Sequence, residues 1–418
     1  MTNRFPQLEH RTEAPRIAVY VRRKAIPAVT SGHPWLFDDS IEKVGSAGKT
    51  GDIAVLFDNN RNFLAAGLYD PASPVRVKIF SHSKKLPPVG PELFRHLAQQ
   101  AAERRAGKIS ADTNAWRVIH GDSDSFPGLV VDKYANALVC KIYSAALLPW
   151  AGTLAEAVAE AVAETVPGID SLVIRLSREL QKLPDSERFG ISDGMTISPD
   201  PNWNALKQFC ENGIVFEADL KRGQKTGFFL DQRDNRKHVS NLSKNCDVLN
   251  VFSYSGGFSL YAAKGGARSV TSVDLDPHAI AMCDRNFELN PDIVSVPHTG
   301  LAGDAFEIFA RLRNEKKLFD LVIVDPPSFA KSAAEVPGAL NSYARLAKAA
   351  VKVLRKGGTL VFASCSSRVD AETLFQTVTN AAAGAGRPLQ VFDRTFHAPD
   401  HPAEFNESHY LKCLYAKA

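Results

Sequence analysis

The sequence predicts a multidomain α/β protein: a small N-terminal β-barrel, a central α+β domain and a C-terminal doubly wound sheet. In residues 16–80, short apolar runs alternate with segments rich in Gly, Pro, Asn and Asp, as in small all-β domains. From Leu249 onward, short apolar strands alternate with helical stretches, as in parallel sheets with helices on both faces. The length of 418 residues and the apolar fraction of 44% suit two or three domains.

The N-terminal region is expected to contain four strands followed by a proline-rich linker at Ser83–Pro91. The strands are 17–21, 53–57, 63–68 and 75–80, separated by the turn segments SGHPW, DNNR and YDPASP. Residues 1–90 carry 13 Lys and Arg against 8 Asp and Glu, while the rest of the chain is near balance at 37 against 38. This excess is compatible with a surface that touches phosphates, and equally with ordinary solvated charge.

A compact α+β unit is expected between the linker and Pro201. A helical pattern covers 92–110, and a second helix runs through 154–165. The expected strands are 116–119, 129–131, 137–143 and 171–176.

Composition excludes several classes of protein. The six cysteines form no CxxC pair and no Cys/His set, which argues against a structural zinc site. No signal peptide is visible, and no stretch of about 18 apolar residues occurs. The expectation is therefore a cytoplasmic protein with reduced cysteines that does not associate with membranes.

The first candidate ligand site is the turn after the strand Val248–Phe252. The turn reads Ser253, Tyr254, Ser255, Gly256, Gly257 and leads into a helix at 258–263. Adjacent glycines allow a ligand to approach the backbone, but the GxGxxG spacing that suits a dinucleotide pyrophosphate is missing. A cofactor without phosphate fits this loop better, and a plain strand–helix turn fits it as well.

Two acidic residues follow the next strands. Asp274 ends the strand 269–273, where a carboxylate can accept hydrogen bonds from ribose hydroxyls. It could instead cap the helix near Pro277, a role that Asp276 could also take. Asp304, in LAGDAF, could hold an adenine amino group or only cap a helix. Together with the glycine turn, these acids favour an adenosine-bearing cofactor.

The strand 321–324 ends in Asp325, Pro326, Pro327, Ser328 and Phe329. The two prolines stiffen the exit from the strand and can hold a planar base, and Phe329 can stack on it. The Asp325 carboxylate is a suitable acceptor for an exocyclic amine such as that of cytosine. The alternative is a rigid turn after a core strand.

Cys365 follows the last candidate strand, 359–363. A cysteine thiolate is the usual nucleophile when a pyrimidine ring must be activated, because its addition to C6 makes C5 nucleophilic. Buried cysteines are usually inert core residues. Its place after the strand that follows the Asp-Pro-Pro strand favours the catalytic interpretation.

The chain resembles, over nearly its whole length, the methyltransferases that make 5-methylcytosine in large-subunit ribosomal RNA. The matching segments are VRRKAIPAVTSGHPWLFDDSI, GDSDSFPGLVVDKYANALV, KTGFFLDQRDNR, VLNVFSYSGGFSLYAAKGGA, SVDLD, DPPSFAKS and SCSS. The resemblance implies an N-terminal PUA-like RNA-binding domain at 1–85, a central α+β domain at 90–203 and a Rossmann-like class I methyltransferase domain at 204–418. It also implies S-adenosylmethionine as the cofactor and ribosomal RNA as the partner.

By this resemblance, Cys365 is the nucleophile, while Asp325 orients the base and faces the cofactor. Pro326, Pro327 and Phe329 would hold the substrate base. The DPP motif has no second cysteine, so the acceptor of the C5 proton is unassigned. The residues implied to bind the cofactor are Phe228, Phe229, Gln232, Arg233, Phe252, Ser253, Tyr254, Gly256, Gly257, Asp274 and Asp304.

Three other functions compete with this interpretation. An RNA N-methyltransferase acting on guanine N7 would need no cysteine, so Cys365 discriminates against it. A non-catalytic RNA-binding or assembly factor would have lost part of the cofactor loop, the DPP motif or the SCS motif, and all three are intact. A dehydrogenase is disfavoured by the missing glycine spacing. The modified nucleotide and the oligomeric state stay open, a homodimer included.

Overall fold

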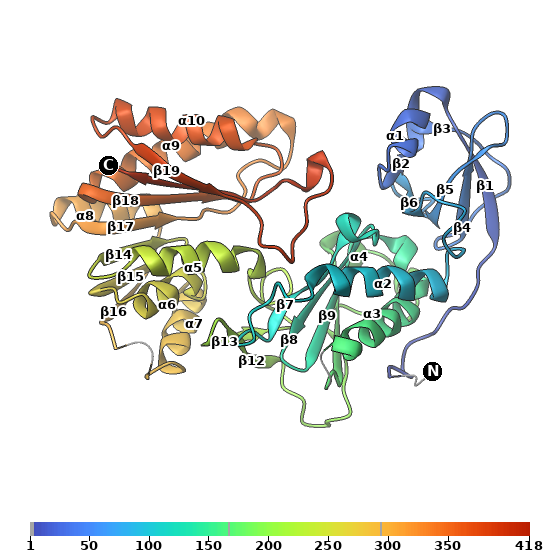
Figure 1. Ribbon diagram of the computed structural model, residues 1–418, viewed down its shortest axis with the longest axis horizontal. Coiled ribbons are helices and arrows are strands. Elements are labelled where there is room, and N and C mark those ends of the chain that lie inside the picture. The colour runs from blue at the N-terminus through green and yellow to red at the C-terminus, as the bar shows by residue number, and fades with distance from the viewer. Residues whose placement is uncertain (1–3, 166–167, 293–294) are drawn as a thin grey trace. The chain divides into compact units, whose positions relative to one another are not determined.

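The computed structural model describes residues 4–165, 168–292 and 295–418, which form two compact units (Figure 1). The first unit comprises Met1–Phe209, Ala218–Leu230 and Pro399–Phe405. The second comprises Cys210–Glu217, Asp231–Ala398 and Asn406–Ala418. The expected break at 85–90 falls inside the first unit, so the three domain boundaries stay predictions.

The N-terminal part of the first unit is a six-stranded sheet in the order β2-β6-β5-β4-β1-β3. Strand β4 has the predicted bounds, and β1, β5 and β6 extend the predicted strands by one residue. Strands β2 and β3 were not predicted, because both are short and Trp35 of β2 lies in a segment interpreted as a turn. The bounds are β1 (Arg16–Val21), β2 (Trp35–Phe37), β3 (Ile41–Val44), β4 (Ile53–Phe57), β5 (Phe63–Tyr69) and β6 (Val75–Ser81), with α1 (Ile26–Thr30) between β1 and β2.

The sheet is stabilised by one alternating apolar face. Ile17, Val19 and Val21 of β1 point inward and are 3% exposed or less, as a strand with a period of two requires. Gly67 of β5 cannot be replaced by a larger residue without a clash, because an added Cβ would lie 2.0 Å from the Lys78 carbonyl oxygen on β6. Close pairing of β5 and β6 therefore depends on the missing side chain.

The rest of the first unit is built on a five-stranded sheet in the order β11-β10-β9-β8-β7. All six residues of β10 are buried, as expected for a central strand covered on both faces. Helices α2 and α3 pack together against this sheet (Figure 1). The bounds are α2 (Pro91–Arg105), β7 (Ala115–His120), β8 (Leu129–Tyr134), β9 (Ala137–Ile142), α3 (Ala151–Thr165), β10 (Ser171–Leu176), α4 (Arg178–Gln181) and β11 (Met195–Ile197).

One helical segment of the first unit is unusually apolar. The helical segment Ala145–Glu164 is long and apolar enough to cross a membrane by length and composition alone. In the structure 89% of this window is buried, and the helix contributes Leu154, Val158 and Val162 to the core of the unit. Its apolar character is thus accounted for by packing.

The second unit contains a seven-stranded sheet in the order β16-β15-β14-β17-β18-β20-β19. Neighbouring strands from β16 to β18 are parallel, and β20 is antiparallel to both β18 and β19. The bounds are β14 (Asp247–Val251), β15 (Ser269–Asp274), β16 (His298–Ala302), β17 (Phe319–Val324), β18 (Leu354–Ser364), β19 (Gln390–Thr395) and β20 (Lys412–Lys417). The hairpin β12 (Leu206–Glu211) and β13 (Ile214–Asp219) forms a separate two-stranded sheet.

Helices cover both faces of this sheet, which confirms the doubly wound prediction (Figure 1). One face packs against α8, α9 and α10, and the other against α5 and α6. The bounds are α5 (Arg233–Leu242), α6 (Gly257–Lys264), α7 (Pro277–Glu288), α8 (Ala305–Asn314), α9 (Val336–Lys352) and α10 (Ala371–Gly384). Most side chains between the sheet and its helices are apolar, and the candidate site residues follow the strand ends.

Candidate active site

The parallel strands of the second unit end along one edge of the sheet. Their register pairs Val251 of β14 with Val273 of β15 and with Val324 of β17. Val324 in turn pairs with Phe362 of β18. Chemistry-bearing residues that follow these ends are therefore neighbours, as ligand sites of open α/β sheets require. They are Phe252, Asp274, Asp304, Asp325 and Cys365.

The loop after β14 has an unusual backbone. Phe252 and Tyr254 have φ angles of 64° and 46°, in the left-handed region that non-glycine residues rarely adopt. Gly256 has a φ of 82°, and an added Cβ there would lie 2.3 Å from Cys283 Sγ. Strained non-glycine residues cluster at ligand sites because the surrounding structure over-determines them. The loop is thus held in one shape, and Gly256 is required by packing as well as by conformation.

Two hydroxyls in this loop support the fit of a polar ligand. The Oγ atoms of Ser253 and Ser255 are buried and have no hydrogen-bond partner among the described residues. Buried polar atoms in native proteins are nearly always satisfied, and a hydroxyl can both donate and accept. A ligand with polar atoms at this loop, such as the amino-acid end of S-adenosylmethionine, would supply the missing partners. Ser253 was predicted for this role, and Ser255 was not.

Asp274 is oriented by two backbone groups. Its Oδ2 accepts a hydrogen bond from the Tyr254 N–H at 2.8 Å, and its Oδ1 accepts one from the Asp276 N–H at 3.1 Å. Asp276 is the residue that caps α7, through the His278 N–H at 2.9 Å. The capping alternative for Asp274 is therefore excluded, and its half-buried carboxylate keeps lone pairs for a ligand's hydroxyls.

Asp304 caps α8. Its Oδ1 accepts hydrogen bonds from the Phe306 N–H at 2.8 Å and the Glu307 N–H at 3.2 Å. No described residue bonds to Oδ2 of this exposed side chain. The capping role is observed, and the contact with adenine stays a prediction.

Asp325 is held by a chain of side-chain hydrogen bonds. Gln232 Nε2 donates to Asp325 Oδ2 at 2.9 Å, and Asn235 Nδ2 donates to Gln232 Oε1 at 2.6 Å. Thr395 Oγ1 donates to Asn235 Oδ1 at 2.6 Å. Gln232 was predicted to bind the cofactor, and Asn235 and Thr395 were not predicted. The three-residue spacing of Gln232 and Asn235 could have signalled a shared helix face.

Helix α5, which carries Asn235, is fixed from its other side by a buried ion pair. The Arg236 guanidinium donates from Nε and Nη2 to the two Glu211 carboxylate oxygens at 2.8 and 2.7 Å. Both side chains are 2% exposed or less. Such bidentate pairs have fixed geometry, so the helix start is held rigidly. Arg233 is also buried, with its Nε 3.3 Å from Asp234 Oδ1.

The predicted phenylalanines at 228 and 229 lie in the first unit. The Phe228 ring packs edge-on against Phe209, with centroids 5.2 Å apart, and its N–H donates to the Tyr134 hydroxyl at 3.1 Å. The Phe229 ring has the Lys225 ammonium 4.7 Å from its centroid. Their contact with the cofactor stays a prediction.

Tyr343 of α9 connects the two loops expected to hold the substrate base. Its hydroxyl shares a hydrogen bond of 2.9 Å with Ser364 Oγ, directly before Cys365. Its ring lies 5.1 Å from the Phe329 ring. Burial raises the pKa of Tyr343, so the phenol stays neutral. In the loop after β17, Pro326 is buried and Pro327 is exposed. Cys365, in the loop after β18, is half-buried.

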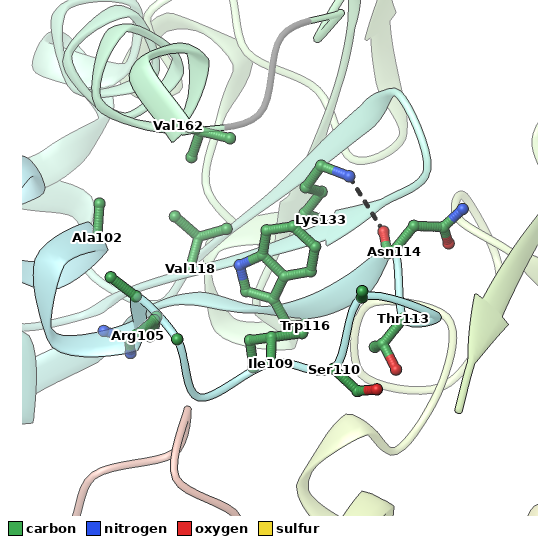
Figure 2. Close-up of a pocket in the computed structure, with 13 residues that line it drawn as sticks. Ala102, Arg105, Ile109, Ser110, Thr113, Asn114, Trp116, Val118, Lys133 and Val162 are labelled. Carbon is green, nitrogen blue, oxygen red and sulfur yellow. Dashed lines mark hydrogen bonds between the residues drawn. The ribbon is translucent and has the colours of Figure 1, made fainter. Parts of the chain in front are cut away.

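The first unit contains a cavity that the sequence did not predict. Its volume is about 470 Å³, and it is lined by α2, β7, β8, α3 and the segment after α2. Figure 2 shows Trp116 within it beside Lys133, whose Nζ donates to the Asn114 carbonyl at 3.1 Å and lies 4.5 Å from the Trp116 ring centroid. Burial lowers the pKa of Lys133 to about 8. Trp116 and Lys133 are opposite each other on β7 and β8 and form a cross-strand pair.

The strand order, the reversed penultimate strand and the acids at successive carboxyl ends define a nucleoside-binding enzyme of the Rossmann-like class. The chain belongs to the S-adenosylmethionine-dependent methyltransferase family, which matches residues 192–415, and residues 19–82 match a PUA-like domain. The predicted fold class and the predicted cofactor are thereby confirmed.

Relatives are similar over nearly the full length. A protein of Deinococcus radiodurans named ribosomal RNA large subunit methyltransferase is 41% identical over 409 residues, covering 97% of this chain and 98% of the relative. Ribosomal RNA large subunit methyltransferase I of Pseudoalteromonas translucida is 33% identical, covering 96% and 99%. A solved methyltransferase structure from Streptococcus mutans has a TM-score of 0.76 at 22% identity, covering 96% of this chain and 100% of that one, which shows the shared fold.

Proposed function

We propose that this protein methylates carbon 5 of a cytosine in large-subunit ribosomal RNA, with Cys365 as the nucleophile. The observation that carries the proposal is the register of β17 and β18. Because Val324 pairs with Phe362, Asp325 and Cys365 leave adjacent strands at the same edge. A pyrimidine held between them would meet a carboxylate for its amine and a thiol for its ring carbon.

The residues of this chain would perform the following steps. Asp325, fixed by Gln232, accepts a hydrogen bond from the exocyclic amine and orients the ring. The Cys365 thiolate forms a bond to C6, which pushes electron density onto C5. When bound, S-adenosylmethionine supplies the methyl group for C5. Loss of the C5 proton then restores the 5,6 double bond as the C6–S bond breaks and the thiolate leaves. The acceptor of that proton is not assigned.

The choice of ribosomal RNA follows from the relatives named above, which share almost the whole length of the chain. The PUA-like domain at 19–82 is the proposed RNA-binding module, in keeping with the basic excess of residues 1–90. The reaction would take place in the cytoplasm, on ribosomal RNA or its assembly intermediates.

The test is transfer of labelled methyl groups from S-adenosylmethionine to large-subunit ribosomal RNA, followed by nucleoside analysis. Wild type should place the label in 5-methylcytidine. Cys365→Ala should lower the rate by on the order of a thousandfold or more, because no other thiol replaces the nucleophile. Cys246→Ala is the matched control: this half-buried cysteine directly precedes β14, at the opposite end of the strands.

The alternatives give different results. Label in a methylated guanosine, with Cys365→Ala as active as wild type, would replace the proposal with RNA N-methylation. Absence of label from a protein that binds S-adenosylmethionine and RNA would favour a non-catalytic assembly factor.

A further inference from the structure

Lys412 of β20 lies beside the loop that carries Cys365. Its backbone pairs with Ser364, the last residue of β18. Its Nζ donates hydrogen bonds to the carbonyl oxygens of Ser366 and Val369. The side chain therefore bridges Ser366 and Val369, in the segment that directly follows Cys365.

The environment of this ammonium group is unusual. Lys412 is 2% exposed, and no ion pair with a carboxylate is observed for it in residues 4–165, 168–292 and 295–418. A buried cation with only neutral acceptors is costly, unless an anion forms next to it. The charged or ionisable groups that act on it are Cys365 and Asp370, and Asp370 is exposed. Cys365 is thus the partly buried group that can become the anion.

We propose that the Lys412 ammonium stabilises the thiolate of Cys365 and fixes its loop for attack on the substrate ring. The inference rests on the proposed role of Cys365 as nucleophile. On ionisation the Sγ–H bond breaks and the proton goes to water, while the cation stays in place. The same charge favours the later step in which the thiolate leaves C6. Lys412 is a positioning residue, because it acts through Cys365 and not on the substrate.

Three other titratable groups near the site do not supply a positive charge. Tyr343, on α9, has a raised pKa because it is buried, and stays neutral. Asp325 at the end of β17 and Asp370 at the start of α10 are acids, so they oppose thiolate formation. Burial lowers the pKa of Lys412 to about 8, which leaves the ammonium charged at neutral pH. Lys412 is therefore a buried cation next to the loop that carries Cys365.

The test is the pH dependence of alkylation of Cys365 by iodoacetamide, measured on the full-length protein without RNA. Tryptic cleavage after Lys356 and Arg368 isolates Cys365 in the peptide GGTLVFASCSSR, so mass spectrometry reports this thiol alone. In wild type, the midpoint of the rate should lie below the ordinary thiol pKa of about 8.5. Lys412→Met should raise the midpoint by about one pH unit or more, and Lys412→Arg should restore most of the shift.

Lys417→Met is the matched control, since Lys417 is an exposed lysine at the other end of β20. It should leave the midpoint unchanged. A wild-type midpoint at or above 8.5 would overturn the inference even if Lys412→Met does not fold. Equal midpoints in wild type and a folded Lys412→Met would overturn it as well.

The outcome is separable from that of the proposed function, because alkylation needs neither RNA nor methyl transfer. A shifted midpoint together with methylated guanosine as the product would support the interaction of Lys412 with the Cys365 thiolate and reject cytosine C5 as the target. An unshifted midpoint together with 5-methylcytidine would do the reverse.

Discussion

Gln232 Nε2 donates a hydrogen bond to Asp325 Oδ2 across 2.9 Å, joining the start of α5 to the end of β17. The amide cannot turn over, because its Oε1 already accepts from Asn235 Nδ2 at 2.6 Å. A flipped amide would set two donors against each other and two acceptors against each other. One carboxylate oxygen of Asp325 is thus fixed by a neighbour 93 residues away in the sequence.

Gln232→Leu should separate a positioning role from the predicted contact with the cofactor. Loss of the bond frees the Asp325 carboxylate to rotate, and misplacement of a catalytic group costs on the order of a hundredfold in rate. We expect kcat to fall by about that factor, with the cofactor Kd changed much less. Steady-state kinetics and calorimetric titration with S-adenosylmethionine measure the two quantities. Gln376→Leu, on the exposed face of α10, is the control. A weakened Kd with unchanged kcat would instead support the cofactor contact.

Thr395→Val tests the far end of the same chain of hydrogen bonds. The substitution keeps the shape of the side chain and removes the donor to Asn235 Oδ1. We expect kcat to fall by about fivefold while KM for RNA stays the same, since a hydrogen bond of this kind contributes about 1 kcal/mol. Thr395→Ser should recover most of the rate. Equal losses in the valine and serine variants would mean that Thr395 acts through packing alone.

Asp274 and Asp276 offer a pair of substitutions with opposite consequences. Asp274→Ala removes a carboxylate aimed at the edge of the sheet, and we expect the cofactor Kd to rise by about tenfold to a hundredfold. Asp276→Ala removes the cap of α7 and should cost about 1 kcal/mol of unfolding free energy with the Kd unchanged. Cofactor titration and urea denaturation of both variants check the pair. The reverse pattern would show that Asp276 is the ribose-binding acid.

The ends of the parallel strands could be predicted from the sequence because fully buried strands are continuous apolar runs. That is why Asp274, Asp325 and Cys365 were found one strand end after another. Their supporting residues could not be found this way. Thr395 reaches Asn235 over 160 positions, and Lys412 lies on a strand that pairs antiparallel to β18. Pairing between such distant segments is set by the whole sheet and leaves no local signal.

The hydrogen-bond partner of Gln232 could not be predicted from the sequence either. The motif KTGFFLDQRDNR identified it as a functional residue, but the motif does not say which atom it contacts. Only the packing of α5 on the sheet brings it to Asp325. Strands β19 and β20 and the β12–β13 hairpin were not predicted either.

Asp304→Ser distinguishes capping from cofactor binding. Serine is as good a helix cap as aspartate, so the stability of α8 should change by only a few tenths of a kcal/mol. The shorter side chain cannot reach an adenine amino group, and we expect the cofactor Kd to rise by about tenfold. Thermal unfolding and cofactor titration give the two readouts. An unchanged Kd would leave Asp304 as a cap only.

Lys133 should make stability depend on pH in the alkaline range. Burial lowers its pKa to about 8 in the folded protein, against about 10.4 in an unfolded chain. Between these values the unfolded state binds a proton that the folded state does not, so the contribution of Lys133 to the unfolding free energy rises with pH. Below pH 8 both states are protonated, and the folded state bears the full cost of the buried charge.

Lys133→Met removes this titration. The unfolding free energy of the variant relative to wild type should therefore be greatest near pH 7 and should decrease as pH rises from 8 towards 10.4. Urea denaturation of both proteins at several pH values measures the difference. Lys108 is an exposed lysine in the segment after α2, and Lys108→Met should have the same unfolding free energy as wild type at every pH. A constant difference between Lys133→Met and wild type would mean that Lys133 keeps an ordinary pKa, and that the Asn114 carbonyl and the Trp116 ring offset its burial.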